Sequence, residues 1–139
     1  MKFPYRITAP SLPLAVTFLL LGSTAWAVDL KLTGDSEVPP VKTAAHGNST
    51  IAIAADGTVA GSVNTTGIAG TMAHIHLGSI GKNGPVIVPL TKGADGAWAV
   101  SPGAKLTSEQ MKSYKSGDLY VNVHSEAHKG GEIRAQLTP

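Results

Sequence analysis

Histidines are the residues of this 139-residue sequence that are best placed to do chemistry, and three of the five are spaced to meet. His74 and His76 stand two residues apart in an alternating segment, so on a β-strand both side chains project from one face, with Cα atoms ~6.5–7 Å apart. His124 ends a second alternating segment. If these two strands are neighbours, the three imidazoles converge outside the sheet. The spacing predicts a three-histidine metal site, and the simpler alternative is a set of unrelated surface histidines.

The absence of cysteine restricts the metals that such a site would hold. It excludes thiolate zinc fingers, iron–sulfur clusters and blue-copper centres, together with disulfide scaffolds and cysteine nucleophiles. Neutral imidazoles without thiolate suit Cu(II), Zn(II) or Ni(II) and leave a fourth coordination position open. We expect copper as the cofactor, with zinc as the alternative.

Other polar residues are candidates for completing or supporting this site. His46 and His128 lie in glycine-flanked segments, where a solvated side chain is the simpler interpretation, although either could supply a fourth ligand. Glu37, Glu126 and Glu132 are candidates for orienting an imidazole through a hydrogen bond, and ordinary surface charge is the alternative for all three.

The first 27 residues are typical of a secretion signal peptide. Lys2 and Arg6 precede a mostly apolar run from Leu12 to Leu21, and Ala25-Trp26-Ala27 places small residues where a signal peptidase cleaves. The apolar run is too short to span a ~30 Å hydrocarbon core, so cleavage is favoured over an uncleaved anchor. We therefore expect a secreted or periplasmic protein with no membrane insertion after cleavage, and a single domain over residues 28–139.

Subtracting the signal changes what the charge of the chain implies. The whole sequence has a formal charge of +2, but Lys2 and Arg6 account for that excess, and residues 28–139 are formally neutral. Only Trp98, Tyr114 and Tyr120 remain as aromatic residues. A neutral domain with three aromatic side chains lacks both the basic patch and the stacking platform of a nucleic-acid-binding protein, so that class of partner is excluded.

The elements that must position the histidines read as short strands separated by glycine-containing turns. Asp56-Gly57, between two alternating runs, is the clearest hairpin turn. The pattern predicts an all-β fold, a Greek-key antiparallel β-sandwich or barrel of about eight strands with one short helix. The expected strands are Asp29–Thr33, Ser49–Ala55, Val59–Asn64, Thr71–Leu77, Val86–Leu90, Ala97–Val100, Leu119–His124 and Glu132–Leu137.

One short helix is expected between the strands Ala97–Val100 and Leu119–His124, over one end of the fold. Thr107 is its N-cap residue, Gln110 stands at the capping-box position and Gly117 closes it. On the neighbouring strand, the alternation places Val121 and Val123 in the core and Tyr120, Asn122 and His124 on the opposite, outer face. No serine-nucleophile, phosphate-loop, zinc-protease or dinucleotide motif is present.

Several motifs, in order along the chain, resemble the CHRD (chordin) domain. They are Glu37-Val38-Pro39-Pro40-Val41, Ala73-His74-Ile75-His76, Gly81 with Asn83-Gly84-Pro85-Val86, Gly117-Asp118-Leu119-Tyr120-Val121-Asn122-Val123-His124 and Gly131-Glu132-Ile133-Arg134. The resemblance runs from about Leu30 to Leu137 and implies a secreted all-β module without a settled biochemical activity. His74, His76 and His124 match the family's motif, whereas His46 and His128 fall at positions that it leaves free.

A more distant likeness is to Cu,Zn superoxide dismutase, in which a His-x-His strand and a late histidine before a Lys-Gly-Gly loop hold copper. Here Lys129-Gly130-Gly131 follows His124 in a similar way. The stretch from Leu77 to Val86 contains no histidine or aspartate, so the zinc-binding loop is absent. The resemblance suggests dismutase-like redox chemistry, which the missing zinc-binding loop does not support. It also suggests Arg134 as a guide for an anion, with a cross-strand surface role as the alternative.

Two functions from different classes follow from these observations. The first is an exported copper-binding protein with a site made by His74, His76 and His124. The second is a metal-free extracytoplasmic module that binds a protein or glycan, or has a structural role in the envelope. An envelope protein is the partner expected for such a module, and an open edge strand would permit a homodimer.

Overall fold

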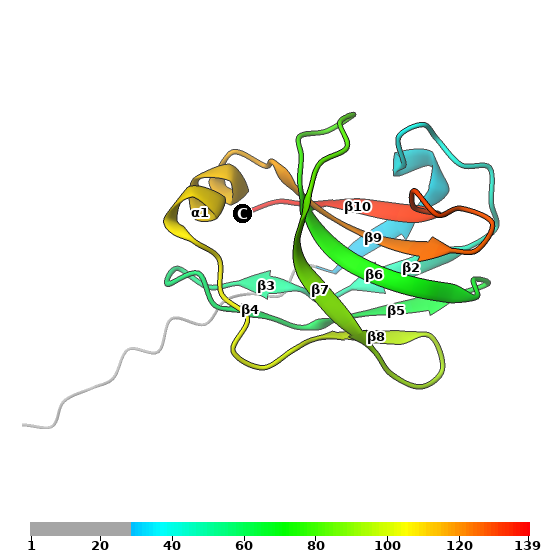
Figure 1. Ribbon diagram of the computed structural model, residues 1–139, viewed down its shortest axis with the longest axis horizontal. Coiled ribbons are helices and arrows are strands. Elements are labelled where there is room, and N and C mark those ends of the chain that lie inside the picture. Colours follow the sequence, from blue (N-terminus) through cyan, green and yellow to red (C-terminus); the bar gives the residue numbers. More distant parts are fainter. Residues whose placement is uncertain (1–28) are drawn as a thin grey trace, which may run out of the picture.

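The computed structural model describes residues 29–139, so the expected signal peptide lies outside the described part of the chain. Eight antiparallel strands close into a barrel, as the strand pattern predicted, in which every strand pairs with two neighbours (Figure 1). In order around the barrel they are β1 (Leu30–Thr33), β10 (Ile133–Leu137), β9 (Leu119–Ser125), β6 (Gly70–Leu77), β7 (Val86–Lys92), β8 (Ala97–Val100), β5 (Ser62–Thr66) and β2 (His46–Ser49).

The connectivity explains how histidines fifty residues apart come together. β6, β7 and β8 are joined in sequence, and the chain then returns through α1 (Ser108–Lys115) so that β9 lies beside β6. The resulting spatial order, β9-β6-β7-β8, is that of a Greek key. This crossover makes His124 a neighbour of the His74 strand.

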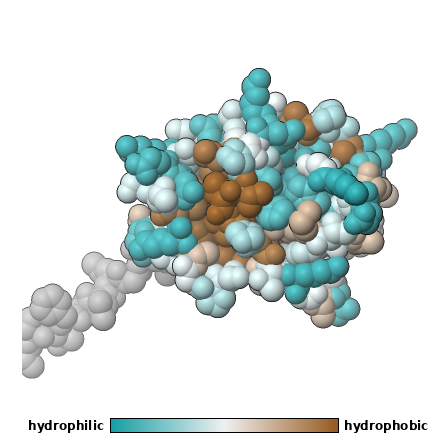
Figure 2. All heavy atoms as spheres, in the orientation of Figure 1, coloured by the Kyte–Doolittle hydropathy of each residue, from teal (hydrophilic) through white to brown (hydrophobic). Residues whose placement is uncertain are grey.

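The barrel interior is filled by apolar side chains from alternate positions on the strands, as expected for a half-buried sheet. Leu32, Val63, Ile75, Val121 and Ile133 are all fully buried there. Each such side chain stabilises the fold by about 1.5–3 kcal/mol. On the face shown in Figure 2, apolar side chains gather near the centre, over β7, and mostly hydrophilic side chains surround them. The barrel core therefore holds β6 and β9 in fixed register.

The sequence pattern missed β2 and placed continuous strands at Ser49–Ala55 and Val59–Asn64, where the structure has breaks. Residues Ser49–Ala55 were expected to be one strand, but β2 ends at Ser49 and a separate β3 (Ala52–Ile53) follows. β3 pairs with β4 (Val59–Ala60) around the predicted Asp56-Gly57 turn. β2 places Gly47 and Ser49 toward the interior. Because neither is apolar, the strand carries no hydrophobic alternation to recognise.

The predicted helix and both of its capping residues are confirmed. Thr107 is the N-cap residue: its side chain accepts from the Gln110 backbone, and the Gln110 side chain accepts from the Thr107 backbone. After the helix, the Gly117 N–H donates to the Tyr114 carbonyl. α1 lies at one end of the barrel (Figure 1), with Met111 and Tyr114 packed against the core.

The outer face of β9 was expected to be exposed to solvent, but it is buried. Tyr120, Asn122 and His124 do point away from Val121 and Val123, yet they are only 2%, 1% and 6% exposed. Two irregular segments cover Tyr120 and Asn122. One follows β1 and includes η1 (Gly34–Ser36), and the other, residues 78–85, joins β6 to β7. The candidate site thus has a second layer of structure outside the barrel.

Candidate metal centre

Three histidines on β6 and β9 form one cluster. β6 and β9 are hydrogen-bonded neighbours, with His74 opposite Asn122 and His124 opposite Met72. One ring nitrogen from each of His74, His76 and His124 lies within 4.8 Å of the others. The shortest separation joins His74 Nδ1 to His124 Nε2, at 3.1 Å. The structure therefore brings together the three residues that the sequence spacing selected.

Backbone carbonyls orient two of the three imidazoles. His76 Nδ1 lies 2.9 Å from the Gly84 carbonyl oxygen, and His124 Nδ1 lies 2.9 Å from that of Lys129. A carbonyl oxygen only accepts, so both Nδ1 atoms carry a proton and donate it. In the neutral rings this leaves the lone pair on Nε2 of each residue, and Nε2 of His124 faces His74 Nδ1. His74 Nδ1 can donate to His124 Nε2, or offer its own lone pair when its proton moves to Nε2.

The donor set fits a metal ion. Nitrogen ligands 2.0–2.1 Å from a tetrahedral ion lie ~3.3 Å from one another, close to the 3.1 Å between His74 Nδ1 and His124 Nε2. His76 Nε2 is buried and has no hydrogen-bond partner. An unpaired buried nitrogen is costly, and coordination would satisfy it. Nδ1 of His74 and Nε2 of the other two residues are therefore the atoms that would hold an ion.

The 78–85 loop fixes the His76 ring from two sides. Its Gly84 N–H donates to the Tyr120 hydroxyl, and the Tyr120 ring stacks on His76 with centroids 4.7 Å apart and planes within 5°. Gly84 must be glycine for this approach, because a Cβ there would overlap the Leu77 carbonyl oxygen. The Gly84 carbonyl and the Tyr120 ring together hold His76 in one orientation, as supporting groups around metal ligands do.

The electrostatics of the cluster favour neutral ligands. Burial lowers the pKa of His74 below its usual range, and positive charge on His124 or His76 would lower that pKa further. Burial is also the largest cause lowering the pKa of His76, although its hydrogen bond to Gly84 opposes the shift. Both imidazoles are therefore deprotonated at neutral pH, which is the state that binds a metal.

The remaining histidines and two of the candidate carboxylates stand apart from the cluster. His46 is exposed and its ring bonds to the Ala44 carbonyl, and His128 lies in the loop after β9; neither belongs to the group of converging ligands. Glu126 is exposed beside Lys129. Glu132 accepts from the hydroxyls of Thr43 and Ser125 rather than from an imidazole. The orienting groups are backbone carbonyls, which residue types in a sequence do not reveal.

Arg134 is neither at the surface nor free to move toward an anion. It is 1% exposed, and its guanidinium carbon lies 3.4 Å from the centre of the Tyr120 ring. Nη1 donates to Asn83 Oδ1 and Nη2 to the Lys82 carbonyl oxygen, at 3.2 and 2.9 Å. The guanidinium therefore ties the 78–85 loop to β9 and β10 and supports the loop that orients His76.

Glu37, the third candidate carboxylate, is 3% exposed and lies beside the Asn122 amide. Burial raises its pKa from 4.5 to about 7, while Asn122 and the charge of Arg134 hold that pKa lower than burial alone would. The carboxyl does not contact the converging imidazole nitrogens as a ligand. It is a buried acid in the layer that covers β9.

Replacing Glu37 with glutamine should change how stability depends on pH. The folded-state pKa of Glu37 is about 7, so the folded chain favours the protonated carboxyl group. Its contribution to the free energy of unfolding is therefore fully present below about pH 4.5 and is lost as the pH rises to 7. The glutamine amide stays neutral, so Glu37→Gln should gain on the order of 1 kcal/mol over wild type between pH 5 and 8. Urea unfolding across this range measures the difference; parallel profiles would contradict it, and Glu109→Gln on the helix is the control.

Comparison with known families supports the resemblance found in the sequence. The family model for the CHRD domain matches residues 28–137, and CHRD domains are typically extracellular. Within residues 29–139, no helix has the length and apolar character needed to cross a membrane. Neither a curated protein nor a solved structure matches the chain, so the likeness to superoxide dismutase rests on the histidine pattern and the Lys-Gly-Gly loop. The chain belongs to the CHRD domain family.

Proposed function

We propose that this protein is an exported, secreted or periplasmic, copper-binding protein whose ligands are His74, His76 and His124. One observation carries the proposal: the Gly84 and Lys129 carbonyls orient two imidazoles, and one ring nitrogen of each of the three histidines lies within 4.8 Å of the others. Such preorganisation is what a coordinating histidine needs. It is not what unrelated surface histidines would show.

Copper is favoured over zinc by the chemistry of the donors. Three neutral imidazoles with no thiolate bind Cu(II) more tightly than Zn(II), because affinity for a given nitrogen site peaks at copper in the divalent series. His74 is only partly buried, so solvent or a small molecule can approach the fourth position. Storage or transfer of copper follows directly from such a site. Superoxide dismutase-like turnover is a further step, tested by copper-dependent superoxide loss above a free-metal control.

Electron paramagnetic resonance of Cu(II)-titrated protein tests the proposal. Chain 28–139 should take up one equivalent and give a spectrum with hyperfine structure from nitrogen ligands. His74→Ala should lose that spectrum, whereas His46→Ala, a histidine outside the cluster, should keep it. A metal-free binding module would show no stoichiometric uptake, and stronger retention of Zn(II) than of Cu(II) in competition would reassign the metal.

The pH dependence of copper binding should reflect the lowered pKa of His74 and of His76. Because protons compete with the metal, affinity falls only where the imidazoles take up protons. An unperturbed histidine does so near pH 6.5. We expect affinity measured against a competing chelator to stay level from pH 8 to about 6.5 and to fall steeply below that. A tenfold loss already between pH 8 and 7 would contradict the lowered pKa values.

A further inference from the structure

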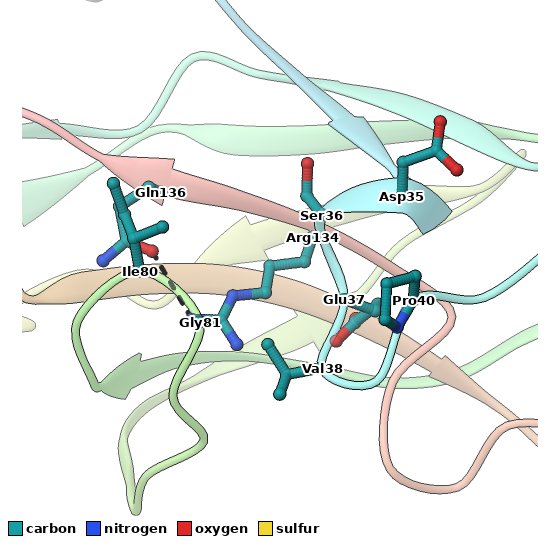
Figure 3. A pocket seen from close by; sticks show the side chains of 9 residues that line it. All are labelled: Asp35, Ser36, Glu37, Val38, Pro40, Ile80, Gly81, Arg134 and Gln136. Atoms are coloured by element: carbon teal, nitrogen blue, oxygen red, sulfur yellow. Dashed lines mark hydrogen bonds between the residues drawn. The ribbon is translucent and has the colours of Figure 1, made fainter.

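The layer that covers β9 and β10 contains a pocket that is separate from the histidines. A pocket of about 500 Å³ opens there between the segment after β1, the tip of the 78–85 loop and β10 (Figure 3). None of the three clustered histidines lines it. Val38, Pro40 and Ile80 give it apolar walls, and Ile80 is 80% exposed at its rim. A mostly apolar cavity of this size suits a small organic ligand.

The hydrogen-bond donors of the pocket are already engaged by the protein. Arg134 donates to Lys82 and Asn83, as described above, and Gln136 Nε2 donates to the carbonyl oxygens of Gly78 and Gly117, at 2.8 and 2.7 Å. The Arg134 guanidinium also lies against the Tyr120 ring. A ligand that offers only acceptors would therefore compete with contacts that hold the loop.

The pocket lining includes one buried hydrogen-bond acceptor, the Glu37 carboxyl group. Glu37 is 3% exposed, and its Oε1 has no hydrogen-bond partner. Within the described residues it forms no ion pair with Arg134, although both line the pocket and lie on two sides of it (Figure 3). A buried carboxylate without an ion pair is unfavourable, and a cation held beside the carboxyl group in the pocket would relieve part of that cost.

The backbone is built to leave room for this carboxyl. Gly131, at φ +127°, passes so close that a Cβ there would overlap both Glu37 Oε1 and the Asn122 amide nitrogen. The carboxyl is thereby held in one place beside Asn122. Asp35, also on the pocket lining and exposed, adds a second negative charge. Above about pH 7, where Glu37 is ionised, two carboxylates stand against one engaged guanidinium, and this charge balance favours a cation.

We propose that this pocket binds a small organic amine, an ammonium group carried on an apolar chain. The ammonium lies against the Glu37 carboxyl group, and the chain packs against Val38, Pro40 and Ile80. The site is independent of copper and uses none of the three histidines.

Titration with matched six-carbon probes tests the proposal. Chain 28–139, freed of metal with chelator at pH 8, is titrated with n-hexylamine, 1-hexanol and hexanoate and followed by amide chemical shifts. Hexylamine should bind at least tenfold more tightly than the alcohol or the acid, with shifts confined to residues 35–40, 78–83 and 134–136. The proposal would be overturned by equal binding of the three probes or by shifts elsewhere in the chain. It would also be overturned by the absence of any shift, the result expected if Glu37 only holds an ordered water.

Variants separate this site from the fold and from the metal centre. Glu37→Gln should lower hexylamine affinity about tenfold without affecting hexanol, and Glu109→Gln should change neither. A second variant leaves Glu37 in place: Ile80→Ser, at an 80% exposed position, should weaken hexylamine binding several-fold through lost apolar contact. His74→Ala should bind hexylamine as wild type does. Unchanged affinity in both pocket variants would overturn the assignment.

Discussion

His124→Ala should lower the affinity for Cu(II) by at least about 100-fold, since loss of a mere supporting partner of a ligand already costs about 10–100-fold. The substitution removes one ligand and also the ring that His74 Nδ1 contacts at 3.1 Å. It further frees the Lys129 carbonyl, to which His124 is bonded. The two remaining histidines would bind only weakly. Copper affinity is measured by competition with a chelator of known strength, at pH 7.5.

The control for this result is a pair of histidines outside the cluster. His46→Ala and His128→Ala should leave copper affinity within about twofold of wild type, since neither residue belongs to the converging group. A loss in His128→Ala comparable with that in His124→Ala would instead identify His128 as the fourth ligand. Equal small losses in all three variants would contradict a single preorganised site.

Arg134→Lys should destabilise the fold by about 2–4 kcal/mol, although it preserves the charge. The guanidinium bonds to two positions of the 78–85 loop and lies on the Tyr120 ring. A lysine ammonium cannot make these contacts at once, because it lacks the planar fork. The buried charge would then be left partly unpaired. The free energy of unfolding in urea gives the magnitude, with metal excluded by chelator.

This substitution also distinguishes the structural role of Arg134 from that of an anion guide. If Arg134 only attracted anions, lysine would serve nearly as well, and stability would hardly change. Lys105→Arg, at an exposed ion pair with Asp56, is the matched control and should shift stability by less than about 0.5 kcal/mol. A stable Arg134→Lys protein would show that the loop does not depend on the guanidinium.

The sequence revealed the strands whose inward positions are apolar and the histidines that share a face. Alternation identified β6 to β10 to within a few residues, because Ile75, Val121 and Val123 mark the core side. β2 escaped detection because small residues fill its inward positions. The metal ligands could be selected from spacing, but their closure needed the pairing of β6 with β9, which is a property of the Greek-key crossover.

The second layer outside β9 was beyond prediction for a different reason. Tyr120 and Arg134 read as surface residues because polar side chains alternate with apolar ones on their strands, and Glu37 reads as one because it is a carboxylate in a segment between strands. They are buried because two loops fold over them, and loop paths depend on long-range contacts rather than on local pattern. The carbonyls of Gly84 and Lys129 that orient the imidazoles could not be predicted either. Every residue has a backbone carbonyl, so residue type does not show which one will contact a histidine.

β9 is covered on both of its faces along its whole length, from Leu119 to Ser125. Segments of this kind are the last to open in local fluctuations, because opening them exposes most of the surface that the fold buries. β9, which carries His124, should therefore keep its strand pairing on the timescale at which exposed loops change conformation. A bound ion would then leave by ligand dissociation at the partly exposed His74 side, and its residence time would not be limited by unfolding of the barrel.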